Sequence, residues 1–354
     1  MRYISVSRIE EGMVLGQDIF DLKGFLLLRH GQKLYGNYIE RLKNMGVIGV
    51  YIADESTQDI EINPVIDDAK KMAAVNNVKN LFMSASRGTA LSLKLMDDAV
   101  NSVQDMVESI FFCKDPVYDV REFKVSADYN FYHAVNVATI SMIMGVGLQM
   151  SKPDLKLLGM CGAFCNIGLT AIKSSVLEKT EVLTPSERTD IQRHSLIGYS
   201  ILRDKYNVNA KVQQGALHHH ERWNGSGYPS GLKGKDIGLF GRITAIADVY
   251  DALVSKRPYR QAYAPFEAVE YIMGNSGILF DPELVKTFTR KVAAYPIGTS
   301  VLLSDGSTGI VKKNHYDCSL RPVVKIIDEK HGVRIIDLKD DKGALNLTIS
   351  AQND

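Results

Sequence analysis

The pattern of the sequence changes twice along the chain, and these changes restrict the fold more than any other feature. From Pro116 to about Ala294 the pattern predicts mostly helices, and this segment holds most of the histidines. Short branched and apolar runs broken by turn residues, which are typical of strands, lie before and after it. We therefore expect a multidomain, mainly α protein, in which a central all-α domain is flanked by a small N-terminal α+β module and a C-terminal β-rich module.

The N-terminal module is placed at residues 1–60. The segments "GMVLGQDIF" and "GFLLLRHGQKL" are short apolar runs separated by charged residues and Gly24, the pattern of a hairpin. Ile48–Ala53 is interpreted as a further strand. Between them, "NYIERLKNMG" has the spacing of a short helix that stops at Gly46.

Residues 61–115 are predicted to form a helical connector. Its apolar residues repeat at helical spacing and form one stripe: Leu91, Leu95, Met96, Val100, Val103, Met106, Val107 and Ile110. Such a stripe either packs within the chain or pairs with a second copy, and the amphipathic pattern does not choose between them. The helical domain then occupies residues 116–292.

Residues 293–354 are assigned to the C-terminal module. The runs "GTSVLLSDGSTGIVKKN", "RPVVKII" and "GVRIIDL" are broken by Asp-Gly and Gly turns, which favours a small barrel or curled sheet. His315, Cys318 and His331 are too irregularly spaced for a metal site, so we interpret them as surface or packing residues.

Composition and charge exclude several classes of partner. With 42 Lys and Arg against 41 Asp and Glu, the chain has no basic field for DNA or RNA. The apolar run Ala138–Met150 is shorter than the roughly 20 residues that span a bilayer, so a buried helix is expected and no membrane contact. The N-terminal residues lack the apolar segment of a signal peptide, and the cysteines form no paired framework. These features predict a cytoplasmic protein.

The histidines of "ALHHHERWNGSGYPSGL" raise the question of a metal site. His219 and His220 are adjacent, so a helix would separate their directions by about 100°, and both can face one ion only where the backbone turns. Taken alone, the run is equally consistent with solvated histidines. Upstream, His133 and His194 each lie near the start of a predicted helix. Downstream, Asp248 and Asp251 lie in an apolar helix, where a buried carboxylate needs a cation.

One set of motifs resembles a known family. The segment His219-His220-Glu221, the turn Gly227-Tyr228-Pro229 and the helix "RITAIADVYDALVSKRPYR" resemble the HD-GYP family of metal-dependent phosphohydrolases, which cleave cyclic di-GMP. The match covers about Asp128 to Tyr271 and includes "HAVNVATIS", "LTPSER" and "RHSLIGYSIL" in family order. The flanking segments resemble modules found beside such domains, but less specifically.

The resemblance implies an all-α HD-type helical domain with two or three metals. By position, His133 and Asp248 would serve the first metal, and His194, His219 and His220 the second. The nucleotide pocket would include Gly227, Tyr228, Pro229, Arg257 and Arg260, because arginine forms paired charge-assisted bonds to phosphate.

The chain departs from the family at the His-Asp pair that completes both metal sites. When the sequences are aligned at Ile167-Gly168, Cys165 occupies the position of the histidine and Asn166 that of the aspartate. Leu169 stands in place of a lysine that contacts substrate phosphate, and Asn224 replaces a further aspartate in the turn.

These substitutions predict an impaired metal centre. Asn166 is neutral and cannot hold two divalent ions about 3.5 to 4 Å apart. Cys165 is either a thiolate ligand beside His133 and Asp248 or a buried, inert thiol next to Cys161. We expect one divalent transition metal (Fe, Mn or Zn) at His194, His219 and His220, or none.

Three functions remain open from the sequence. The first is a degenerate HD-GYP protein with little or no hydrolytic activity, which binds cyclic di-GMP, a protein partner or a second copy of itself. The second is an active cyclic di-GMP phosphodiesterase with a rearranged metal site. The third is a ligand-free structural dimerisation protein. Metal content together with a turnover assay on cyclic di-GMP distinguishes the three.

Overall fold

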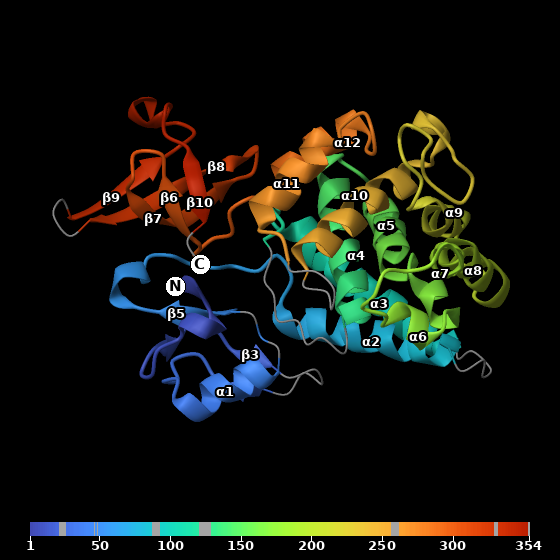
Figure 1. Cartoon of the computed structure of the whole chain (residues 1–354), viewed down its shortest axis with the longest axis horizontal. Helices are drawn as coiled ribbons and strands as arrows, with labels where there is room; N and C mark the ends of the chain where they lie inside the picture. The colour runs from blue at the N-terminus through green and yellow to red at the C-terminus, as the bar shows by residue number, and fades with distance from the viewer. Residues whose placement is uncertain are drawn as a thin grey trace.

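The computed structural model describes residues 1–20, 26–45, 47, 49–86, 93–119, 129–255, 262–328 and 332–352. A helical domain lies on one side of the molecule, and two separate sheet regions formed by the chain ends lie on the other (Figure 1). None of the helices in these ranges is long and apolar enough to cross a membrane.

The N-terminal module has its own small sheet and core. Strands β1 (Arg2–Ser5), β5 (Gly49–Ala53) and β2 (Val14–Leu15) form an antiparallel sheet in the order β1-β5-β2. Strands β3 (Ile19–Phe20) and β4 (Leu26–Leu28) form the predicted hairpin, and helix α1 spans Gly36–Asn44. The hairpin, the strand and the short helix are therefore confirmed, whereas Gly24, Gly46 and Ile48 lie outside the described residues.

Long helices make up the helical domain. Their bounds are α2 Asp68–Ser86, α3 Leu93–Phe112, α4 Tyr129–Gly147, α5 Lys152–Phe164, α6 Ser174–Leu177, α7 Pro185–Gln192, α8 His194–Ser200, α9 Ala210–His218, α10 Leu239–Val254, α11 Pro265–Gly274 and α12 Pro282–Lys291. A 3-10 turn, η4 (Ile167–Ala171), follows α5, and a π-helical turn, η5 (Ile201–Lys205), extends α8.

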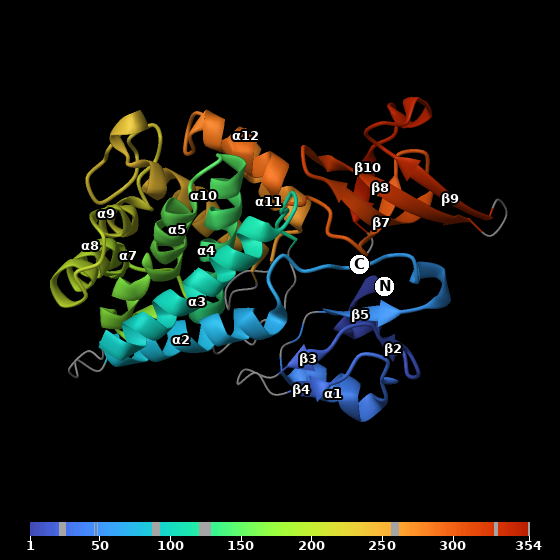
Figure 2. The same ribbon diagram turned by 180° about the vertical axis from the view of Figure 1, so that it is seen from behind.

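Helix α4 forms the centre of this domain. It is buried along almost its whole length and contacts α2, α5, α10 and α12, as expected for the apolar run at Ala138–Met150. Figure 2 shows α2 and α3 lying side by side along the bundle. The stripe on α3, including Met96, Val103 and Ile110, is buried in the same core as α4 and α5. The stripe therefore packs within the chain, and its first residue, Leu91, lies outside the described residues.

The C-terminal module is an antiparallel sheet. Its strands are β6 (Ser300–Leu303), β7 (Thr308–His315), β8 (Cys318–Asp328), β9 (Gly332–Asp337) and β10 (Ile349–Gln352), in the order β10-β6-β7-β8-β9. In the described residues β10 and β9 are the two edges, so the sheet is open and the barrel alternative is wrong. The ring of His315 lies 2.9 Å from a carboxylate oxygen of Asp337, and His331 is outside the described residues.

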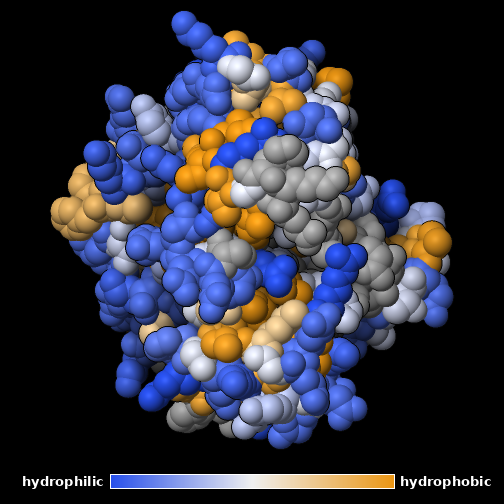
Figure 3. Space-filling model, turned by 90° about the vertical axis from the view of Figure 1, so that its left-hand side faces the viewer, coloured by the Kyte–Doolittle hydropathy of each residue, from blue (hydrophilic) through white to orange (hydrophobic). Residues whose placement is uncertain are grey.

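The two terminal modules contact each other. Asp59 accepts from Lys312 and Lys325 of the C-terminal sheet at 2.5 Å each, and the Tyr3 amide donates to the Gly298 carbonyl at 2.9 Å. Figure 3 shows hydrophobic patches between hydrophilic side chains on this side of the molecule.

Candidate metal centre

The candidate ligands come from five separate elements that the bundle brings together. His133 lies on α4, Asn166 between α5 and η4, and His194 at the first residue of α8. Helix α9 ends at His218, so the backbone turns at the two histidines that follow it. Asp248 lies on α10, which packs against both α4 and α9.

His194, His219 and His220 form the histidine cluster, and one ligand nitrogen from each lies within 4.8 Å of the others. Nδ1 of His194 donates to the Ile191 carbonyl at 2.7 Å, and Nδ1 of His219 donates to the Ala216 carbonyl at 2.6 Å. A neutral imidazole whose Nδ1 carries the proton has a lone pair on Nε2. The Nε2 atoms of His194 and His219 face each other at 3.2 Å.

Burial keeps the histidine cluster neutral. It lowers the pKa of His194, lowers that of His219 to about 3, and lowers that of His220 well below the usual value. Two facing lone pairs repel unless a cation lies between them. Nitrogen ligands of one ion also lie about 3 Å apart, because metal–nitrogen distances are about 2.0–2.1 Å. The donor atoms of this cluster therefore fit a divalent metal ion.

His133 has different surroundings. Its Nδ1 lies 2.7 Å from a carboxylate oxygen of Asp251, and its Nε2 lies 3.0 Å from one of Asp248. Burial opposes the charged imidazolium, but the hydrogen bonds to the two carboxylates outweigh it and raise the pKa of His133. Burial also favours neutral Asp248, yet the hydrogen bond from His133 holds the pKa of Asp248 well below its usual value. Both ring nitrogens of His133 thus face carboxylate oxygens, an arrangement that favours the protonated imidazole.

Two amides complete this ion cluster. Asn166 Nδ2 donates to Asp248 Oδ1 at 3.1 Å, and Asn136 Nδ2 donates to Asp251 Oδ1 at 2.8 Å. The same Asp248 oxygen therefore accepts from both His133 and Asn166. The position expected to carry a bridging carboxylate carries a hydrogen-bond donor, so His133, Asp248 and Asn166 satisfy one another without a metal ion and do not fit a second divalent ion.

Cys165 and Leu169 add no charge to the centre. Burial raises the pKa of the Cys165 thiol well above its usual value, and the thiol donates to the Gly162 carbonyl at 3.3 Å. These observations favour an inert thiol, although Sγ lies within 4.8 Å of ligand atoms of His219 and Asp248. Leu169 lies partly buried in η4.

The Gly-Tyr-Pro turn is attached to the histidine cluster. The buried carboxylate of Glu221 accepts from the amides of Ser230 at 2.7 Å and Leu232 at 3.0 Å. The Tyr228 ring stacks on His220 with centroids 4.7 Å apart. A methyl group added at Gly227 would lie 2.4 Å from the backbone nitrogen of Arg222, so only glycine fits there. Pro229 follows in the same turn, whereas Arg257 and Arg260 lie outside the described residues.

From the sequence, Asn136 has no predicted role, Glu221 belongs to the family motif without a stated partner, and Asp251 is predicted only to be a buried acid that needs a cation. Asp251 is one helical turn from Asp248, and Asn136 is one turn from His133, so their spacing predicts that each pair shares a helix face. That spacing was the available signal for the ion cluster. No periodicity indicates that Glu221 would fold back onto the amides of Ser230 and Leu232.

Gly168 sets the position of His194, which allows a prediction. A methyl group at Gly168 would lie 1.9 Å from the His194 carbonyl oxygen and 2.6 Å from the Gly198 nitrogen. We expect Gly168→Ala to lower the free energy of unfolding by about 1–3 kcal/mol, because α8 must move away. Gly274→Ala is the control, since nothing lies within 4 Å of that site. Urea unfolding compares the two, and equal midpoints would contradict this packing.

The chain is similar to known proteins that contain an HD domain. A model of the HD domain family matches residues 120–284. A cyclic di-GMP phosphodiesterase of Pseudomonas aeruginosa is 32% identical over 249 residues, which are 70% of this chain and 59% of that protein. The cyclic di-GMP phosphodiesterase response regulator RpfG of Xanthomonas campestris is 42% identical over 146 residues, covering 40% of this chain and 38% of its own.

One solved structure shares the fold over most of the chain. An HDG"Y"P protein from Bdellovibrio bacteriovorus superimposes with a TM-score of 0.50 at 16% identity, covering 81% of this chain and 97% of its own. The two curated relatives are longer, since the chain spans 59% and 38% of their lengths.

Proposed function

The chain belongs to the HD-GYP family, and from that premise we propose that it binds cyclic di-GMP at a single-metal site and hydrolyses it little or not at all. The observation that carries the proposal is the difference between the two halves of the centre. In the histidine cluster the Nε2 atoms of His194 and His219 face each other without a proton between them, whereas Asp248 already accepts hydrogen bonds from His133 and from Asn166.

The histidine cluster would hold one ion. Imidazole nitrogens suit zinc and iron, and the family resemblance adds manganese, so we propose one of these three metals at His194, His219 and His220. Such an ion supplies a Lewis acid that polarises a phosphate oxygen. The protein fixes the orientation of two of the rings. Nδ1 of His194 donates to the Ile191 carbonyl, and Nδ1 of His219 donates to the Ala216 carbonyl.

Little turnover is expected because several charges are lacking. Asn166 donates a hydrogen bond where the family has an anionic bridge, and Leu169 supplies no cation for phosphate. Removing one group that stabilises transition-state charge costs about 10² to 10³-fold in rate. Loss of the second ion and of the lysine together would thus reduce hydrolysis by several orders of magnitude.

Nucleotide binding can persist without those groups. We propose that Gly227, Tyr228 and Pro229 line the nucleotide pocket, with Arg257 and Arg260 on the phosphates. The Tyr228 ring is held by His220, which makes it a preformed surface for a base, and base–aromatic stacking contributes about 1–3 kcal/mol per base. We propose that the nucleotide-bound chain then acts on a protein partner or on a second copy of itself.

The alternative is an active phosphodiesterase with a rearranged site. The retention of all five candidate ligands, His133, His194, His219, His220 and Asp248, favours it. Calorimetric titration of the manganese-loaded chain with cyclic di-GMP, followed by chromatography of the products, separates the two functions. Saturable binding without product supports the proposal, and steady product formation supports the alternative. No binding and no product would leave a structural dimerisation protein.

A further inference from the structure

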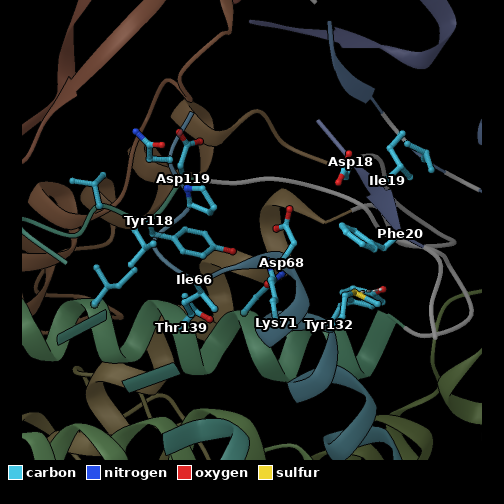
Figure 4. A pocket seen from close by; sticks show the side chains of 18 of the residues that line it. Asp18, Ile19, Phe20, Ile66, Asp68, Lys71, Tyr118, Asp119, Tyr132 and Thr139 are labelled. Carbon is cyan, nitrogen blue, oxygen red and sulfur yellow. Dashed lines mark hydrogen bonds between the residues drawn. The ribbon is translucent and has the colours of Figure 1, made fainter. Parts of the chain in front are cut away.

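A second cavity lies where the N-terminal module meets the helical domain, and its lining contains none of the candidate metal ligands. Its volume is about 100 Å³. Figure 4 shows side chains from separate parts of the chain around it, with Phe20 from β3, Lys71 from α2, and Tyr132 and Thr139 from α4. The cavity is several times larger than the roughly 10–15 Å³ that one water needs.

The walls of this cavity are mainly apolar. Most of its lining residues are apolar or aromatic, among them Phe20, Val65, Tyr118 and Tyr132. Its charged lining residues are Asp18, Asp68, Asp119 and Lys71, so carboxylates outnumber ammonium groups. Asp18 also accepts from the backbone and ring of His30 at 2.7 and 2.9 Å. The charge balance of the lining favours a cationic ligand over an anionic one.

Asn136 is one of the residues that line this cavity, and one of its polar atoms has no hydrogen-bond partner among the described residues. Its side chain is 4% exposed, and its Nδ2 donates to the Asp251 carboxylate at 2.8 Å, which fixes the orientation of the amide. Its Oδ1 is buried and accepts no hydrogen bond from the described residues. Buried carbonyl oxygens are almost always hydrogen-bonded, so this atom indicates that a donor from outside the chain belongs there.

We propose that the cavity binds a small organic ammonium compound with an apolar body of about one ring. An engineered closed cavity of about 150 Å³ holds benzene. This cavity of about 100 Å³ is smaller but partly open, so it takes one ring whose remaining atoms extend toward the opening. The apolar body contacts residues such as Phe20 and Val65, and the ammonium group donates to Asn136 Oδ1.

The same asparagine connects the cavity to the metal centre. Asn136 donates to Asp251 at 2.8 Å, and the His133 ring hydrogen-bonds Asp251 at 2.7 Å and Asp248 at 3.0 Å. A carboxylate oxygen of Asp248 lies within 4.8 Å of a ring nitrogen of His219, so this series of hydrogen bonds ends beside the histidine cluster. A ligand that donates to Asn136 changes the first hydrogen bond of this series. Ligand binding in the cavity would therefore regulate metal affinity at the histidine cluster. This connection rests on the proposed metal site, whereas ligand binding itself does not.

Calorimetric titration of the full chain with benzylamine, benzyl alcohol and benzoate tests the binding site. Benzylamine is expected to bind with a dissociation constant of about 1 mM, and the other two at least about tenfold more weakly. Val65→Phe fills the cavity and should weaken benzylamine binding at least about tenfold. Val182→Phe, at a position 90% exposed, is the matched control and should leave binding unchanged.

Asn136→Leu provides a second variant that removes the acceptor without adding a ring. It should also weaken benzylamine binding at least about tenfold, with its circular dichroism spectrum unchanged. Benzoate binding as well as benzylamine, or full affinity in Val65→Phe, would overturn the proposal. The absence of saturable binding by any of the three compounds would overturn it as well.

The connection is tested by zinc affinity, measured by competition with a chelator. Saturating benzylamine should change the zinc affinity of the unaltered chain at least about fivefold, since coupling between two linked sites typically changes affinity by about 5- to 150-fold. Unchanged zinc affinity with benzylamine bound would overturn the connection. A chain that binds benzylamine but no zinc would count against the proposed function alone.

Discussion

The combined variant Cys165→His, Asn166→Asp and Leu169→Lys is expected to raise cyclic di-GMP hydrolysis by at least about 10²-fold over the unaltered chain. The aspartate would replace an amide that now donates to Asp248 at 3.1 Å, and so would add a negative charge between two ion positions. The histidine would replace a protonated thiol, and the lysine would add a cation for phosphate. Product formation by the manganese-loaded proteins measures the effect.

A matched control isolates the bridging charge. The double variant Cys165→His and Leu169→Lys keeps the Asn166 amide, so we expect it to bind one ion and to gain less than about tenfold in rate. If the triple variant gains a second ion but no activity, the defect lies elsewhere in the chain. If the double variant alone restores the activity, the role given to Asn166 is wrong.

Of the three consecutive histidines, His219 and His220 are candidate metal ligands and His218 is not. His219→Ala is expected to abolish metal binding, because it removes one of the two Nε2 atoms that face each other at 3.2 Å. His218→Ala should leave metal binding intact, since His218 ends α9 and is not part of the histidine cluster. The two variants remove the same group at adjacent positions, which makes His218 a close control.

Thermal unfolding with and without zinc provides the measurement. A ligand at 1,000 times its dissociation constant stabilises the folded state by about 4.1 kcal/mol, so saturating zinc should raise the midpoint of the unaltered chain by several degrees. His218→Ala should retain this increase, and His219→Ala should lose it. If His219→Ala kept the zinc-dependent increase and His218→Ala lost it, the histidine cluster would not be the metal site.

The sequence predicted the elements better than their contacts. The helical run at Ala138–Met150, the hairpin and the short helix in the N-terminal module were identified from periodicity and turn residues, and the structure contains them. The two histidines after α9 were expected to need a turn in the backbone, and α9 ends immediately before them. These features depend on local sequence alone.

The ion cluster around His133 was not predicted because it depends on tertiary packing. Asp251 was recognised as a buried acid that needs a cation, but the sequence did not indicate that His133 would provide the charge from another helix. Likewise, nothing in the local pattern predicts that Asn166 turns its amide nitrogen toward Asp248. The barrel alternative for the C-terminal module was wrong for a related reason. Strand order is a tertiary feature, and in the described residues it leaves β9 and β10 as unpaired edges of an open sheet.

Metal stoichiometry under saturating Mn²⁺, combined with electron paramagnetic resonance, distinguishes a one-ion centre from a two-ion centre. We expect one ion per chain with the spectrum of an isolated manganese, since His194, His219 and His220 provide the proposed donor set. Two ions per chain with an exchange-coupled spectrum would show that a neutral amide at position 166 suffices to bridge them, and the account would then be wrong.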